Sequence, residues 1–107
     1  MFSELQSAGG GGGGGLSNGW NDTWTSSTTY ETKTIELPFE PIMVMSRGVY
    51  GTVWYRQSTS DSWSKCSINT TGYDNSYITS VSGKNVTFKN NHSGTNTYYL
   101  YAVGESV

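Results

Sequence analysis

The chain has 107 residues, enough for one domain, and a formal net charge of −2 at pH 7. Its six basic residues lie singly along the chain, so we expect no nucleic-acid partner, because phosphate binding needs grouped Lys and Arg. One cysteine permits no internal disulfide and, together with one histidine, falls short of a structural zinc site, so we expect no metal or other cofactor.

The first residues resemble a docking arm more than a secretion leader. They begin Met1-Phe2-Ser3 without a basic segment, and no long apolar run occurs anywhere in the chain, so we expect no signal peptide and no membrane insertion. Seven consecutive glycines then disfavour both helix and strand, because glycine loses the most backbone entropy on ordering. We interpret residues 1–15 as a docking peptide and a glycine strap that lies in a narrow groove, with a disordered terminus as the alternative. The predicted assembly anchor is Phe2, Leu5, Gly9, Gly12 and Gly15.

Residues 16–31 are polar and aromatic, and we assign them to a connector outside the domain. Asn18-Gly19 and Asn21-Asp22 are turn signals. Trp20 and Trp24 could form an exposed binding platform or cap the end of a β-core. The second interpretation is favoured, because large aromatic side chains gain most from burial.

From residue 32 onward, short β-rich segments follow one another between turn signals. We predict about seven strands, at 32–37, 42–45, 52–56, 62–68, 77–81, 85–89 and 97–103. This spacing is typical of an all-β fold, here a single small antiparallel β-sandwich over 32–107 preceded by the glycine-rich N-terminal arm. The segment Ile42–Met45 is apolar on both faces and predicts a central strand that is covered on each side.

The last predicted strand also carries more apolar residues than one buried face requires. The surplus indicates either a subunit interface or a central position. The predicted interface residues are Tyr98, Leu100 and Tyr101. A domain this small, without disulfide or metal, also favours a homo-oligomer.

No constellation of reactive residues indicates catalysis, so we expect a protein that is not an enzyme. His92 lies in a polar loop and is interpreted as solvated. Cys66 lies within a predicted strand and is interpreted as a small buried residue. The acidic residues are too dispersed to propose a carboxylate pair.

Aromatic residues beside the loops offer a candidate ligand or receptor surface. Aromatic faces between Asn and Ser side chains can stack on sugars and donate hydrogen bonds to them. The candidates are Tyr50, Trp54, Tyr73 and Tyr77. An ordinary tyrosine-rich core explains the same residues equally well.

Three stretches carry a resemblance to a known group of proteins: Leu37-Pro38-Phe39-Glu40-Pro41 before an apolar strand, Val81-Ser82-Gly83-Lys84-Asn85-Val86-Thr87-Phe88, and Tyr98-Tyr99-Leu100-Tyr101-Ala102-Val103-Gly104. Over roughly residues 32–104 the chain is similar to the small C-terminal β-domains of phage and prophage tail-fibre and tail-tip proteins. That resemblance implies a trimer at the tip of a fibre. Unlike members of that group, this chain is expected to lack a fibre shaft.

We therefore expect a non-enzymatic structural accessory protein of a phage virion, of the fibre-tip or capsid-decoration type. It would be made in the host cytoplasm, join the virion through its N-terminal arm, contact other virion proteins as a homotrimer, and display the β-sandwich, with a cell-surface glycan as a possible host receptor. The alternative is a free carbohydrate-binding, lectin-like module.

Overall fold

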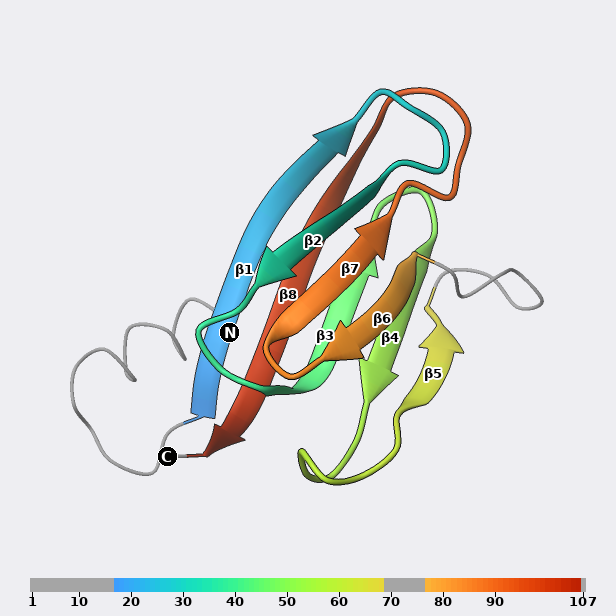
Figure 1. Ribbon diagram of the computed structural model, residues 1–107. Helices are drawn as coiled ribbons and strands as arrows, with labels where there is room; N and C mark the ends of the chain where they lie inside the picture. Colours follow the sequence, from blue (N-terminus) through green and yellow to red (C-terminus); the bar gives the residue numbers. More distant parts are fainter. Residues whose placement is uncertain (1–16, 69–76, 107) are drawn as a thin grey trace.

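A computed structural model describes residues 17–68 and 77–106, and over these ranges the protein is an antiparallel β-sandwich (Figure 1). A five-stranded sheet has the order β1-β8-β3-β4-β5, and a three-stranded sheet has the order β2-β7-β6. The strands are β1 (Ser17–Ser26), β2 (Thr32–Glu36), β3 (Pro41–Arg47), β4 (Gly51–Tyr55), β5 (Ser64–Ser67), β6 (Ile78–Ser82), β7 (Asn85–Lys89) and β8 (Asn96–Ser106). The described part contains no helix that could cross a membrane. The predicted all-β class is confirmed.

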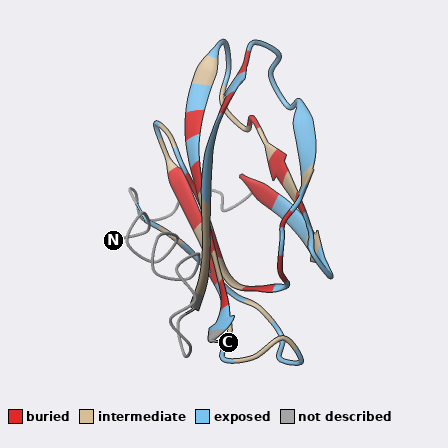
Figure 2. Ribbon diagram, turned by 90° about the vertical axis from the view of Figure 1, so that its left-hand side faces the viewer, coloured by how far each residue is buried: buried red, intermediate tan, exposed pale blue. Residues whose placement is uncertain are grey.

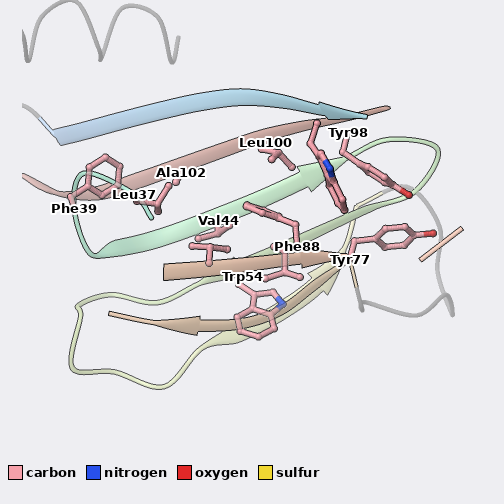
Figure 3. Packing of buried hydrophobic residues seen from close by; sticks show 12 residues of the cluster. Leu37, Phe39, Val44, Trp54, Tyr77, Phe88, Tyr98, Leu100 and Ala102 are labelled. Carbon is pink, nitrogen blue, oxygen red and sulfur yellow. The ribbon is translucent and has the colours of Figure 1, made fainter. Parts of the chain in front are cut away.

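The core fills the space between the two sheets, and alternation along each strand determines which residues enter it. Val86 and Phe88 of β7 face Val44 of β3 and Leu100 of β8, and all four are completely buried. Figure 2 shows that both layers contain strand segments that are buried. Figure 3 shows Leu37 and Phe39 closing one end of the core and Tyr77 and Tyr98 closing the other.

The first strand corrects the prediction that residues 16–31 are a connector. Ser17–Ser26 pairs along its length with β8 and forms one edge of the five-stranded sheet. Trp24 is buried and Trp20 packs against the core, so the capping interpretation of this tryptophan pair is confirmed. The polar residues of β1 resemble a turn because one face of an edge strand can lie in water. A bulge between Ser17 and Gly19 accommodates the turn-prone Asn18-Gly19 sequence.

The prediction for Ile42–Met45 is half right. β3 lies at the centre of the five-stranded sheet, between β8 and β4. Within the described chain, however, strands cover only its inner face, because the three-stranded sheet is the only other layer. Met43 and Met45 point to the opposite side.

The strand registers place the two ends of the described chain together. Ser17 pairs with Ser106, so the N-terminal segment joins the sandwich at the end where β8 finishes. The β1–β2, β3–β4 and β7–β8 connections lie at the other end of the strands (Figure 1). We call the end with Ser17 and Ser106 the arm end, and the end with the three connections the loop end.

Candidate interaction surface

The outward side of the five-stranded sheet carries a continuous apolar surface. Three cross-strand rows form it, each read from the backbone register: Gly19-Val103-Met43-Tyr55-Ser64, Asn21-Tyr101-Met45-Val53-Cys66 and Thr23-Tyr99-Arg47-Gly51. The residues between them along β3, β4 and β8 are buried in the core, so side-chain alternation directs the rows away from it. We call this surface the outer apolar face.

Large side chains and few charges distinguish the outer apolar face. Tyr55 and Tyr99 are 47% and 44% exposed, although both are large aromatic residues. The one charged residue in the rows is Arg47, and its guanidinium carbon lies 5.2 Å from the centroid of the Tyr99 ring. Asn21 and Thr23 of β1 give the face a polar margin. An apolar centre with a polar rim and depleted charge is the composition of interface cores.

The outward side of the three-stranded sheet is different in kind. Its outward residues are Thr32, Thr34, Glu36, Ser80, Ser82, Asn85, Thr87 and Lys89. Thr34 and Thr87 share a hydrogen bond of 2.8 Å between their hydroxyl groups. This chain therefore makes an ordinary solvated sheet surface on one side and an apolar one on the other.

The predicted interface residues divide between the two sides of β8. Tyr98 and Leu100 are 1% and 0% exposed and pack inside the domain, so their assignment to a subunit interface is wrong. Tyr101 alternates with them and lies on the outer apolar face. The strand is apolar on both faces because one face belongs to the core and the other to this surface.

The predicted aromatic ligand surface does not form. Trp54 and Tyr77 are buried in the core, which contradicts their assignment as exposed ligand contacts. The indole of Trp54 lies between Trp63, at 6.0 Å, and the ammonium group of Lys65, at 4.0 Å from the ring centroid. Tyr50 stacks at a tilt against His92 in the loop end, 5.5 Å between ring centroids. Tyr73 lies outside the described residues.

A buried polar cluster organises the loop end around Asn90. Its side-chain amide donates to the Ser26 hydroxyl at 3.2 Å, the Thr28 carbonyl at 3.0 Å and the Gly94 carbonyl at 3.2 Å. Its carbonyl oxygen accepts from the side chain of Asn96 and from the Tyr98 hydroxyl. Burial, and then the neighbouring Tyr77, raises the pKa of Tyr98 well above its usual range, so the phenol keeps its proton at the alkaline pH where an ordinary tyrosine ionises.

At the arm end, Arg56 fixes the β4–β5 loop. Its guanidinium donates twice to the Pro41 carbonyl, at 2.8 and 3.2 Å, and also to the carbonyls of Thr59 and Asp61. The same group lies 4.0 Å from the centroid of Trp63. These contacts are structural, because all of the acceptors are backbone groups of the fold itself.

Reactive residues are dispersed over the described chain. Cys66 is exposed at the margin of the outer apolar face, which corrects its prediction as a buried residue. Cys66 is exposed because it lies on the outward side of β5, an edge strand of the five-stranded sheet. Within residues 17–68 and 77–106, His, Cys, Asp and Glu form no group able to hold a metal ion. The predicted anchor (Phe2, Leu5, Gly9, Gly12 and Gly15) lies outside the described residues.

Comparisons with protein-family models, curated proteins and solved structures found no match to this chain.

Proposed function

We propose that this protein is a non-enzymatic structural subunit of a particle, attached through its N-terminal arm and displaying the β-sandwich. The observation that carries the proposal is that the two ends of the described sandwich, Ser17 and Ser106, lie side by side. Because Ser17 pairs with Ser106, an arm anchored in a particle would hold the sandwich by one end and present the loop end outward. The resemblance to phage tail-tip domains supports a virion as the particle.

The rigidity of the loop end supports a display role. Asn90 is completely buried and ties β1, the β1–β2 connection and the β7–β8 connection together. Tyr30, at 65% exposed, and the half-buried pair of Tyr50 and His92 belong to connections at this end. Aromatic residues on a rigid support can contact a host surface at little entropic cost.

The test replaces Phe2 and Leu5 by serine in the full-length chain. If the arm is the anchor, this double variant should be lost from purified particles, while its circular dichroism remains that of the wild type. The matched control is Thr34→Ser, which changes a solvated position on the three-stranded sheet and should leave incorporation unchanged. Full occupancy of particles by the double variant would contradict the proposed anchor.

A further inference from the structure

We propose that the outer apolar face binds a second copy of this chain, which packs its own outer apolar face against it around a two-fold axis. This inference goes beyond the proposed function, since it concerns a different part of the molecule from the arm. The geometry is that of a second sandwich: two sheets pack about 10 Å apart with interdigitating side chains, as the two sheets already do inside the domain.

The chemistry of the face selects a partner that is itself apolar and nearly uncharged. In its three rows the one charge is Arg47, which already lies over Tyr99. An acidic protein, a nucleic acid or an anionic lipid surface would find no cluster of basic residues there. An identical face supplies matching tyrosine, methionine and valine side chains without opposing an acidic group. Methionines such as Met43 and Met45 adapt their shape to a facing surface.

The size of the face suits a second copy. Five strands spaced by about 4.8 Å give a width of roughly 24 Å, and three rows two residues apart cover roughly 20 Å along the strands. Each copy would therefore bury about 500 Å², and the pair about 1,000 Å² in total, which is the lower limit for a specific protein interface. The expected dimer is one that dissociates on dilution.

The chain's own N-terminal segment is a poorer occupant. Seven of its residues are glycines, which bring no side chain to cover the methionines and tyrosines of the face. Phe2 and Leu5 could fill only part of the three rows, two of which cross five strands and one of which crosses four. A second copy covers all three rows at once.

Sedimentation equilibrium of the full-length chain tests the inference. The wild type should have twice the monomer mass of 11.7 kDa at high concentration and dissociate on dilution, over a range of about 100 µM to 1 µM. Met45→Glu places a charge at the centre of the face and should weaken association at least tenfold. Tyr55→Glu repeats the test at a second residue of the face. Tyr55 is 47% exposed, so the fold of the domain does not depend on its side chain. Ser80→Glu puts the same charge on the solvated sheet and should leave the dimer intact.

Each alternative occupant predicts a different result. A wild type that stays monomeric throughout this range overturns the inference and leaves the face to a different protein. Association lost on replacing Phe2 and Leu5 by serine also overturns it, because the arm would then be the occupant. A mass of three monomers overturns two-fold pairing and supports the trimer expected from the tail-tip resemblance. None of these results depends on whether the protein enters particles, so the inference and the proposed function fail separately.

Discussion

Asn90 shows how one side chain determines the shape of the loop end. It is completely buried, yet it is polar, and a buried amide is tolerated only when its donors and acceptors are paired. Here the amide bridges the end of β1 and the two connections beside it. Two backbone hydrogen bonds also link Asn90 to Tyr30 and Glu31, at 2.7 and 2.8 Å, and the side chain extends this link to β1 and to the rest of the β7–β8 connection.

Asn90→Ala should lower the free energy of unfolding by about 2–4 kcal/mol, because it leaves the buried Tyr98 hydroxyl without its acceptor and empties the space that the amide filled. Tyr98→Phe removes only one of these hydrogen bonds and should cost about 1 kcal/mol. Urea unfolding of both single variants and the double variant measures the coupling. Additive losses would show that the two residues do not act as one cluster.

On the inner side of the five-stranded sheet, by contrast, three buried polar groups have no hydrogen-bond partner within the described structure. Ser46 and Thr52 are cross-strand neighbours on β3 and β4, and both are buried. Their hydroxyl oxygens, like the indole nitrogen of Trp54, have no hydrogen-bond partner within the described structure.

At the scale of elements, β8 and the β2–β3 connection meet at Gly104. A side-chain Cβ at this position would lie 2.7 Å from a ring carbon of Phe39 and 3.3 Å from the Cβ of Asn18. The ring of Phe39 is itself buried and closes the core between Leu37 and Pro41. Gly104, near the end of β8, is therefore required by close packing.

Gly104→Ala should lower the free energy of unfolding by about 1–3 kcal/mol, the usual cost of overpacking. Adding Phe39→Leu should recover part of that loss, because the smaller side chain gives the new methyl group room. The measurement is urea unfolding of the two single variants and the double variant. If the double variant loses at least the sum of both single losses, the clash at Phe39 is not the cause.

Alternation and turn residues were sufficient to predict most strands, and they failed where tertiary position decides. Pro38 correctly marked the end of β2, because proline cannot continue a ladder. β1 was missed because it is an edge strand, so its outward residues are as polar as those of a loop. The predicted interface combined residues from both faces of β8, and alternation separates Tyr101 from Tyr98 and Leu100 but does not say which face meets the core. That choice depends on the pairing with β3 and on the other sheet.

At the scale of the whole molecule, the sandwich has two unlike outer surfaces. Threonine and serine cover the three-stranded sheet, whereas tyrosine, methionine and valine cover the five-stranded one. Both surfaces belong to one small domain. The difference in their polarity is therefore not a consequence of the overall composition of the chain. A surface this apolar would be costly to hydrate in a monomer, and the cost falls when a partner covers it.

If two folded copies share this face, the folded state is stabilised by association, and its thermal midpoint must rise with protein concentration. For a domain of this size we expect roughly 3–6 °C for each tenfold increase in concentration, since each protomer gains half of the association free energy. Scanning calorimetry at several concentrations measures the shift. Ser80→Glu should retain it. Met45→Glu should abolish it, because the variant unfolds as a monomer. An equal shift in Met45→Glu and the wild type would place the contact between copies elsewhere on the molecule, since a charge at the centre of the face cannot be both buried in the contact and without effect.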